Sequence, residues 1–321
     1  MKIFVTRKIP EQGLDLLRKE HELEINPHDR VLTKEEIIKG VRGKDGLLCL
    51  LTDTIDADVV NSEPKLKMIS SYAVGYNNID VKAATKRGIP VSNTPGVLTD
   101  ATSDMAWALL FSVARRIVEA DKFTRAGKFK GWGPMLMHGQ DVTNKTLGVV
   151  GAGRIGTAFA LKSKGFNMKI LYVDSKTNEI LEKNLGAKKV ELEELLKESD
   201  FVSLHVPLLS STYHLIGEQE LRMMKKTAIL VNTSRGPIVD EKALVKSLKE
   251  KWIFGAGLDV YENEPHIEKE LLKLNNVVLQ PHSASATVES RTKMAIMAAE
   301  NMLAGLAGEK PPNCINPKFF K

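Results

Sequence analysis

Short apolar runs alternate with amphipathic stretches along almost the whole chain. In the first part, the runs with the character of buried strands are KIFVT, GLLCLL, MISS and IPVSNT. The stretches between them have apolar residues at helical spacing and glycine near their ends, as in PEQGLDLLRKE, TKEEIIKGVRG and DVKAATKRG. Strands that alternate with helices in this way predict a parallel sheet that is covered by helices on both faces.

The same rhythm restarts near residue 146, which predicts a second unit of the same general kind. Its expected strands are TLGVVG, MKILYVD, FVSLHVP, TAILVN, IFGAGLDV and NVVLQPH. Two long helical segments separate the units, Asp100 to Arg116 and Val288 to Gly305. The second precedes a proline-rich tail, KPPNCINP, and we expect it to lead the chain back to the first unit. The predicted class is therefore α/β with two doubly wound parallel sheets, in a discontinuous domain (1–99 and 288–321) and a continuous one (100–287).

Length and composition support two domains of ordinary globular type. A chain of 321 residues is longer than most proteins with a single hydrophobic core, so two domains are expected. Its content of 43% apolar and 27% charged residues is typical of globular proteins. The longest apolar stretch, Met105 to Ala114, is interrupted by Ser112 and is too short for a membrane span. The start, MKIFVTRKIP, has too short an apolar segment for a signal peptide.

Cysteine and charge narrow the class of function. Cys49 and Cys314 are far apart in sequence and have no CxxC spacing, so we expect neither a metal site nor a disulfide framework, as suits a reducing cytoplasm. The net charge of +6 raises the question of nucleic acid, but lysines alternate with glutamates in stretches such as KKVELEELLKESD. Such stretches are typical of solvated helix faces. We therefore expect neither a nucleic-acid nor a membrane partner.

A glycine motif marks a dinucleotide site. Gly151-Ala152-Gly153-Arg154-Ile155-Gly156 follows the strand TLGVV and begins a helical stretch. In this context Gly151 permits a tight turn, Gly153 lets the backbone approach a pyrophosphate, and Gly156 allows close packing of helix on strand. The free N–H groups and positive dipole end of the helix then face the phosphates.

The next strand, MKILYVD, ends in Asp174, about 20 residues beyond the motif, where a ribose-binding acid is expected. A carboxylate there accepts hydrogen bonds from the ribose hydroxyls and repels a 2′-phosphate. NAD is therefore the expected cofactor. Lys176 lies nearby and leaves NADP open as the alternative.

Three polar residues follow later strands, at the sheet edge where open α/β folds bind ligands. Arg235 follows TAILVN, Glu264 follows GLDVYEN, and His282 follows NVVLQP. The planar fork of an arginine can hold a carboxylate and polarise an adjacent ketone. A histidine can donate a proton to the ketone oxygen near neutral pH, and a carboxylate keeps that imidazole protonated and oriented. Together they predict hydride transfer to a 2-oxo acid, with Glu262 as the alternative partner of the histidine.

The ordered motifs resemble a known family over essentially the whole chain. GAGRIG, Asp174, NTSRG, LDVYENEP and PHSASAT occur in the order found in the D-isomer-specific 2-hydroxyacid dehydrogenases. Within that family the chain is most similar to the glyoxylate/hydroxypyruvate reductases, through stretches such as SYAVGYNNID and NTPGVLTDATSDMAWALL. The resemblance implies a flavodoxin-like substrate domain, a Rossmann-type cofactor domain and a homodimer formed through the cofactor domains.

The resemblance also implies roles for further residues. Backbone at Val74 and Gly75 and the side chain of Ser285 are expected to help Arg235 hold the substrate carboxylate. Residues expected along the cofactor, besides the glycine motif and Asp174, are Thr102, Arg154, Ile155, Pro207, Thr212, Thr233 and Asp259. Trp132 is expected either to reach the active site of a partner subunit or to pack in an ordinary interface or core.

Some features leave the substrate and the class of activity open. Many relatives read HIGSAT where this chain reads HSASAT, and the added hydroxyl of Ser283 bears on nicotinamide packing or substrate preference. D-3-phosphoglycerate dehydrogenase, or another D-2-hydroxyacid dehydrogenase, is the alternative among enzymes. A phosphite dehydrogenase is disfavoured because Val74 stands where that enzyme has a lysine. From a different class, NADH-sensing corepressors share the fold.

Overall fold

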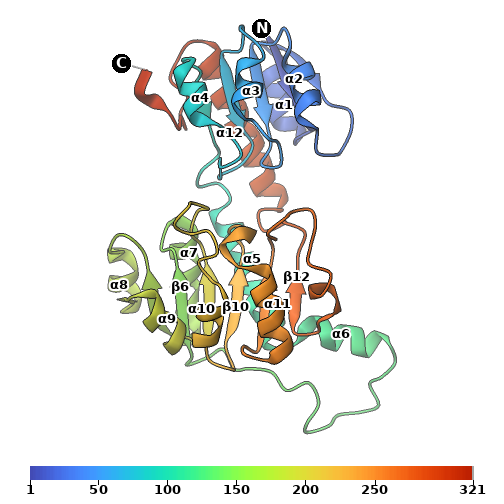
Figure 1. Cartoon of the computed structure of the whole chain (residues 1–321), viewed down its shortest axis with the longest axis vertical. Coiled ribbons are helices and arrows are strands. Elements are labelled where there is room, and N and C mark those ends of the chain that lie inside the picture. Colours follow the sequence, from blue (N-terminus) through green and yellow to red (C-terminus); the bar gives the residue numbers. More distant parts are fainter. Residues whose placement is uncertain (320–321) are drawn as a thin grey trace. The chain divides into compact units, whose positions relative to one another are not determined.

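A computed structural model describes residues 1–319, which fold into two compact units (Figure 1). Unit 1 comprises Met1–Leu98 and the segment that begins at Ala286, and unit 2 comprises Thr99–Ser285. Each unit is built on its own parallel sheet. The predicted α/β class with two parallel sheets is confirmed.

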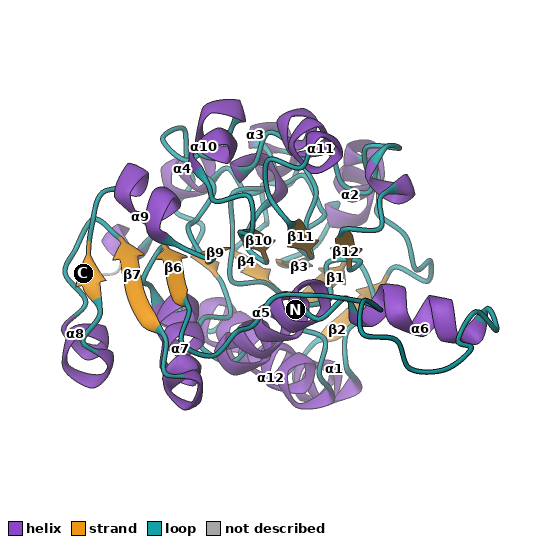
Figure 2. Ribbon diagram, turned by 90° about the horizontal axis from the view of Figure 1, so that it is seen from below, coloured by secondary structure: helices purple, strands orange, loops and turns teal. Residues whose placement is uncertain are grey.

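The strand order in unit 1 is β2-β1-β3-β4-β5, the flavodoxin order that was expected. Its strands are β1 (Lys2–Val5), β2 (Glu22–Ile25), β3 (Gly46–Cys49), β4 (Met68–Ser71) and β5 (Val91–Ser92). Its α-helices are α1 (Glu11–Arg18), α2 (Lys34–Val41), α3 (Ala57–Asn61), α4 (Val81–Lys86) and α12 (Val288–Leu306), and a short 3₁₀ turn spans Pro317–Phe319. Figure 2 shows α1 and α12 on one face of this sheet and α2, α3 and α4 on the other.

Helix α12 is tied closely to the sheet and to helix α1. The hydroxyl of Ser70 in β4 donates to the carbonyl of Ala298 in α12 at 2.8 Å. Gly13 of α1 faces the backbone of Ala295 so closely that a Cβ at this position would collide with the carbonyl group. The close approach explains why a glycine occupies the third position of α1, although glycine is intrinsically unfavourable within a helix.

Unit 2 has the strand order β12-β11-β10-β9-β6-β7-β8. Its strands are β6 (Thr146–Val150), β7 (Lys169–Val173), β8 (Lys188–Lys189), β9 (Phe201–Leu204), β10 (Ile229–Asn232), β11 (Gly255–Leu258) and β12 (Val277–Leu279). Its α-helices are α5 (Thr99–Ala114), α6 (Ile117–Arg125), α7 (Arg154–Lys162), α8 (Glu179–Leu185), α9 (Leu192–Glu198), α10 (Glu218–Met223) and α11 (Glu241–Glu250). Short 3₁₀ turns span Ser163–Phe166, Gly236–Ile238 and Leu271–Lys273.

In unit 2 the order of the strands reverses between β6 and β9, as in the Rossmann fold. Figure 2 shows α9, α10 and α11 on one face of the sheet and α5 and α7 on the other. Strands β6, β9 and β10 are almost entirely buried because helices cover both faces. Since all the strands are parallel, the loops that follow them gather along one edge of the sheet.

The pattern of apolar residues missed two edge strands, β2 and β8, and two helices, α3 and α6, although it located the edge strands β5 and β12. Strand β2, ELEI, alternates glutamates with half-buried residues, and β8 consists of two exposed lysines. Helix α3 has five residues, and α6 has no buried residue. These elements bury little apolar surface, so they leave only a weak signal in the sequence.

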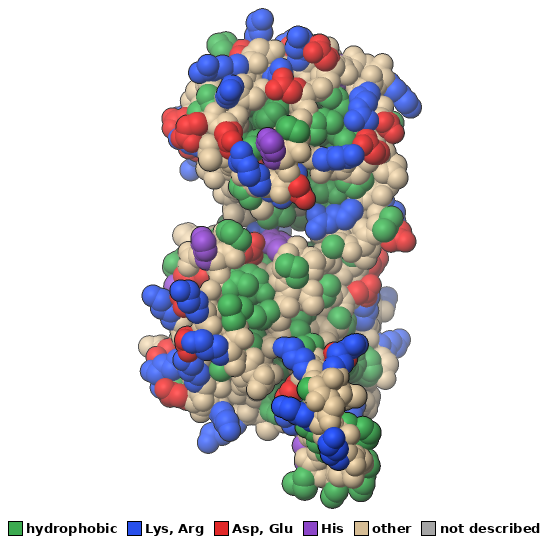
Figure 3. Space-filling view, turned by 90° about the vertical axis from the view of Figure 1, so that its right-hand side faces the viewer, with side chains coloured by type: hydrophobic (Ala, Val, Ile, Leu, Met, Phe, Trp, Pro, Cys, Tyr) green, Lys and Arg blue, Asp and Glu red, His purple; other side chains and the backbone are tan. Residues whose placement is uncertain are grey.

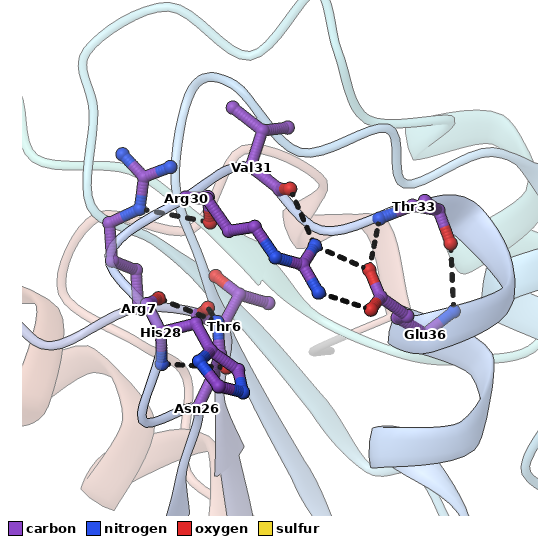
Figure 4. A network of polar contacts seen from close by, with 8 residues as sticks. All are labelled: Thr6, Arg7, Asn26, His28, Arg30, Val31, Thr33 and Glu36. Carbon is purple, nitrogen blue, oxygen red and sulfur yellow. Dashed lines mark hydrogen bonds and ion pairs between the residues drawn. The ribbon is translucent and has the colours of Figure 1, made fainter.

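The loops that follow β1 and β2 in unit 1 are fixed by polar contacts (Figure 4). The amide of Asn26 donates to the carbonyls of Thr6 and His28 at 2.9 and 3.0 Å. The guanidinium of Arg30 forms a two-pronged pair with Glu36, at 2.8 and 2.5 Å. Glu36 also accepts from the N–H of Thr33 and completes a capping box at the start of α2.

Two features are absent from residues 1–319. Over this range no helix combines the length and apolar character that a membrane span needs. Over the same range His, Cys, Asp and Glu side chains do not gather in groups of three or more that could hold a metal ion.

Gly13→Ala should lower Tm by a few degrees, as measured by differential scanning calorimetry. Helix propensity alone favours alanine by about 1 kcal/mol. However, the new Cβ has no room against Ala295, and overpacking costs about 1–3 kcal/mol. Gly165→Ala is the matched control, since a Cβ there meets no atom within 4 Å and should leave Tm unchanged or raise it. A higher Tm for Gly13→Ala would contradict the close packing.

Candidate functional site

The glycine motif forms the turn between β6 and α7. Gly151 follows the strand directly, with φ of +95°, a conformation that favours glycine. Gly153 is the N-cap of α7, and a Cβ there would meet no atom within 4 Å. By contrast, a Cβ at Gly156 would strike the carbonyl oxygen of Gly151. The turn is therefore tight at both ends and open at Gly153, where backbone N–H groups at the helix start can receive a phosphate.

Asp174 lies just beyond β7, next to this turn. One carboxylate oxygen accepts from the N–H of Ala152 at 2.8 Å, and the other accepts from the N–H of Lys176 at 3.1 Å. Each carboxylate oxygen can accept more than one hydrogen bond, so Asp174 can still bind the hydroxyls of a ribose. Ser175 and Lys176 are exposed beside it.

The loop that follows β9 brings Pro207 and Thr212 together. The hydroxyl of Thr212 donates to the carbonyl of Pro207 at 2.7 Å and accepts from the N–H of Leu209 at 2.8 Å. Thr233 follows β10, and its buried hydroxyl has no hydrogen-bond partner among the described residues. A buried hydroxyl of this kind is costly unless a bound molecule satisfies it.

Arg235 follows β10 in extended backbone, at the start of the 3₁₀ turn. One guanidinium nitrogen donates to the carbonyl of Ser234 at 2.7 Å, and its own carbonyl accepts from the amide of Asn232 at 2.9 Å. Burial lowers the pKa of Arg235, and the negative charge of Glu264 opposes this effect. An arginine remains protonated nonetheless, so a positive charge lies at the sheet edge with little solvent around it.

His282 and Glu264 form an ion pair beyond the ends of β12 and β11. Nδ1 of His282 lies 2.8 Å from Oε2 of Glu264, and Oε1 of Glu264 accepts from the N–H of Tyr261 at 3.0 Å. The peptide bond between Glu264 and Pro265 is cis. Burial alone would raise the pKa of Glu264, but the hydrogen bond and charge of His282, with help from Tyr261 and Arg235, lower it.

Asp259 fixes the backbone turn that carries the histidine. Its carbonyl accepts from the N–H of His282 at 2.9 Å, and its two carboxylate oxygens accept from the N–H groups of Ser283 and Ala284 at 2.7 and 2.9 Å. His282 itself has a φ of +52°. Burial raises the pKa of Asp259, and the two N–H groups oppose that rise. The hydroxyl of Ser283, the departure noted in the sequence, lies 3.2 Å from Oε1 of Gln280.

The remaining predicted residues are spread over both units. Thr102 is buried in the first turns of α5, and Ser285 is the last residue of unit 2. Val74 and Gly75 follow β4 in unit 1, where the carbonyl of Val74 accepts from the amide of Asn93 at 2.7 Å. Trp132 lies in the long loop after α6 and is 86% exposed, so the alternative of an ordinary core tryptophan is wrong within the single chain.

Sequence reasoning missed a second ion pair near the first. His214, in the loop after β9, lies 2.9 Å from Glu262 through Nε2 and Oε1. Glu262 was the alternative partner for His282, but it contacts a different histidine. No sequence motif marks His214, and only its position beside Thr212 could have suggested it.

The arrangement in unit 2 fits a nicotinamide dinucleotide. The open helix start at Gly153, the acid at Asp174 and the unsatisfied hydroxyl of Thr233 all lie along one edge of one sheet. Arg235 and the His282–Glu264 pair follow neighbouring strands at that same edge. A cation, a proton donor and a dinucleotide turn are the groups that reduction of a 2-oxo acid requires.

Comparisons with known proteins identify the family. Residues 107–284 match the model of the D-isomer specific 2-hydroxyacid dehydrogenase NAD-binding domain. Glyoxylate reductase of Korarchaeum cryptofilum is 58% identical over 100% of this chain and 97% of its own. Glyoxylate reductase of Thermococcus litoralis is 54% identical over 98% of this chain and 96% of its own. The crystal structure of a Thermus thermophilus protein has a TM-score of 0.93 and 44% identity, and covers 98% of this chain and 100% of its own.

A match over more than half of the chain and identities above 50% along its length leave one conclusion. The motifs found in the sequence and the site geometry agree with it. The chain belongs to the D-isomer specific 2-hydroxyacid dehydrogenase family.

Proposed function

We propose that this protein uses NAD(P)H to reduce a small 2-oxo acid, glyoxylate or hydroxypyruvate, to the D-2-hydroxy acid. The observation that carries the proposal is the His282–Glu264 ion pair with Arg235 close enough to affect the pKa of its carboxylate. The names of the relatives support glyoxylate as the substrate. The protein is an NAD(P)-dependent dehydrogenase, and the proposal concerns its substrate and the residues that act on it.

In this proposal Arg235 binds the substrate carboxylate and polarises the neighbouring ketone. One of its guanidinium nitrogens donates to the carbonyl of Ser234, and the planar group carries five N–H donors in all, in a fork that matches a carboxylate. Because burial removes solvent around it, its attraction for an anion is stronger than at an open surface. Val74, Gly75 and Ser285 are proposed to complete the carboxylate contacts.

His282 is proposed to be the acid that completes the reduction. Its Nδ1 is paired with Glu264, so Nε2 is the nitrogen left to donate a proton. When bound, the reduced nicotinamide supplies the hydride to the carbonyl carbon. His282 then donates its proton to the ketone oxygen, and Glu264 keeps the imidazole oriented and favours its charged form. Glu264 can do so because its lowered pKa keeps it ionised.

The cofactor roles and the division of labour between domains belong to the same proposal. Residues 100–287 are proposed to bind the dinucleotide and residues 1–99 with 288–321 to bind the substrate. The proposed cofactor contacts are Thr102, Gly151, Gly153, Arg154, Ile155, Gly156, Asp174, Pro207, Thr212, Thr233 and Asp259. The open helix start at Gly153 and the unsatisfied Thr233 hydroxyl support them.

We also propose a cytoplasmic homodimer formed through the cofactor domains. The loop after α6 carries exposed apolar side chains, with Phe129 54%, Trp132 86% and Met135 78% exposed. Figure 3 shows apolar side chains gathered at the lower end of unit 2. Exposed apolar patches of this kind mark interaction sites, and a second copy of the chain is the proposed occupant.

A panel of 2-oxo acids with NADH and NADPH tests the proposed function. Glyoxylate and hydroxypyruvate should give the highest kcat/KM. A preference for 3-phosphohydroxypyruvate would instead indicate a D-3-phosphoglycerate dehydrogenase. Cofactor binding with no turnover of any acid would indicate the corepressor class.

Asp174→Ala should lower kcat/KM with NADH and improve the relative use of NADPH. The variant loses both the acceptor for the ribose hydroxyls and the repulsion of a 2′-phosphate. Asp141→Ala, in the loop before β6, is the matched control for loss of a carboxylate and should leave the cofactor ratio unchanged. If the NADH/NADPH ratio of kcat/KM stays at the parent value in Asp174→Ala, Asp174 is not the ribose acid.

Glu264→Gln should make reduction fail at a lower pH than in the parent. Reduction needs the protonated imidazole, so activity falls as pH rises. Glu264 has a lowered pKa and stays negatively charged throughout this range, which favours the protonated histidine. Glu264→Gln removes that charge, and the high-pH midpoint of the kcat/KM profile should move down. Glu262→Gln, which leaves the His282 pair intact, should not move that midpoint, and equal midpoints in all three proteins would contradict the role of Glu264.

Arg235→Lys should severely reduce kcat/KM for glyoxylate and leave the Kd of NADH nearly unchanged. Lysine keeps the charge but lacks the planar fork that orients a carboxylate. Loss of one charge-assisted bond costs about 1.5–3 kcal/mol, roughly ten- to a hundredfold in rate, and misorientation of the ketone adds to it. Arg125→Lys is the matched control, because Arg125 is exposed on α6 and should leave turnover unchanged. Arg154 is also exposed but borders the proposed cofactor turn, so it cannot serve as the control. Turnover by Arg235→Lys within about threefold of the parent would show that charge alone suffices.

A further inference from the structure

The loops that follow β9, β10 and β11 are tied together by a network that the proposed mechanism does not use. We call the set His214, Glu262 and Glu241 the loop-coupling network. His214 lies in the loop that carries Pro207 and Thr212, and Glu262 lies two residues before Glu264. Glu241 is the first residue of α11, six residues after Arg235.

His214 joins its loop to the two other segments. Its N–H donates to the carbonyl of Pro237 at 2.8 Å, and its Nε2 donates to Oε1 of Glu262 at 2.9 Å. The ring of Tyr213 stacks on the imidazole, with centroids 4.1 Å apart and planes at 17°. Three contacts therefore fix the side chain: the stacked ring of Tyr213, the hydrogen bond to Glu262, and the backbone hydrogen bond to Pro237.

Glu262 is held in turn by the start of α11. Its second oxygen, Oε2, accepts from the N–H of Glu241 at 3.2 Å, and its own N–H donates to Oε2 of Glu241 at 2.8 Å. Glu241 is 5% exposed, and its other oxygen accepts from the N–H of Glu268 at 2.8 Å. A carboxylate is favoured at a helix start, where N–H groups have no partner inside the helix.

The segments joined in this way carry the residues proposed to react. Ile216 pairs with Val239 through a parallel bridge and an N–H donated to the carbonyl of Ile238 at 3.0 Å, which aligns the loop after β9 with the segment after Arg235. Gly236 lies so close to the backbone of Tyr261 that a Cβ would collide with it. Tyr261 donates its N–H to Glu264. A displacement at Glu262 therefore reaches both Arg235 and Glu264 through short chains of direct contacts.

We propose that His214, acting through Glu262, is a positioning residue that couples the cofactor-binding loop to the segments bearing Arg235 and Glu264. This inference rests on the proposed function, since Pro207 and Thr212 are proposed contacts of the dinucleotide. The histidine does not touch the reacting atoms. It fixes the positions of the three loops relative to one another, so that the bound cofactor and the bound substrate keep a fixed relative position.

His214→Ala tests the coupling. The Kd of NADH, measured by fluorescence titration, should rise roughly ten- to a hundredfold, the range expected for loss of one charge-assisted hydrogen bond. The kcat for glyoxylate should fall as well, because Arg235 and Glu264 lose their support. The high-pH midpoint of kcat/KM should stay at the parent value, because the His282–Glu264 pair remains intact.

Two further variants separate positioning from a purely structural role. His214→Gln keeps an N–H that can donate to Glu262, so it should recover most of the NADH affinity and most of the kcat. In the double variant His214→Ala/Glu262→Ala, the Kd of NADH should not exceed the higher of the two values measured for the single variants. The effects should not add, because both substitutions remove the contact between His214 and Glu262. His266→Ala, at an exposed histidine in the same loop as Glu262, is the matched control and should behave as the parent.

The outcomes are distinguishable. If His214→Ala binds NADH and turns over glyoxylate within about twofold of the parent, or if only Tm changes, the coupling is wrong. If His214→Ala does not fold, His214→Gln and Glu262→Gln carry the test, and Glu262→Gln should weaken NADH binding in the same direction. A parent that binds NADH but reduces no 2-oxo acid overturns the proposed function, while the shift in Kd still decides the coupling. A parent that binds no NADH overturns both.

Discussion

The site depends on one constraint, the parallel register of β10, β11 and β12. Asn232 of β10 pairs with Leu258 of β11, and Leu258 pairs with Leu279 of β12, so the three strands end at one level. The loops beyond them begin side by side, and their polar residues come together although Arg235 and His282 are 47 positions apart in the sequence. The strands themselves are buried and carry no chemistry. Their backbone hydrogen bonds fix the level at which the loops with the polar residues begin.

At this edge of the sheet two opposing effects set the pKa values of the charged side chains: burial disfavours the charged form, and a neighbouring opposite charge favours it. Burial lowers the pKa of Arg235 and would raise that of Glu264, yet each opposes the other's shift, and His282 tips the pKa of Glu264 downward. Asp259 shows the other outcome, because its pKa is raised by burial in spite of two N–H donors. The carboxylate of Glu264 thus remains charged beside the histidine with which it is paired. That of Asp259 is a backbone anchor for the turn on which the histidine lies.

The loops are not independent of each other. The loop-coupling network places an ion pair, a helix start and a close backbone contact at Gly236 between the segments that carry the proposed cofactor and substrate contacts. The same design recurs at Asp174, which accepts from Ala152 and so joins the end of β7 to the glycine turn. In both places a carboxylate binds backbone N–H groups of a neighbouring loop. Rigid placement of reacting groups in α/β enzymes requires such support because loops have little internal hydrogen bonding.

The sequence by itself determined the two α/β units, the glycine turn and the motif residues, because buried strands, helices and tight turns each leave a local pattern. It could not locate β2 or α6, which bury little apolar surface, nor the reason for a glycine at position 13, which lies in the backbone of a helix more than 280 residues away. It left Glu262 and Glu264 as rivals for one histidine, since both adjoin Asn263 and carry the same side chain. Only tertiary structure gave each glutamate its own histidine, because hydrogen bonds depend on distances of about 3 Å that sequence spacing does not encode.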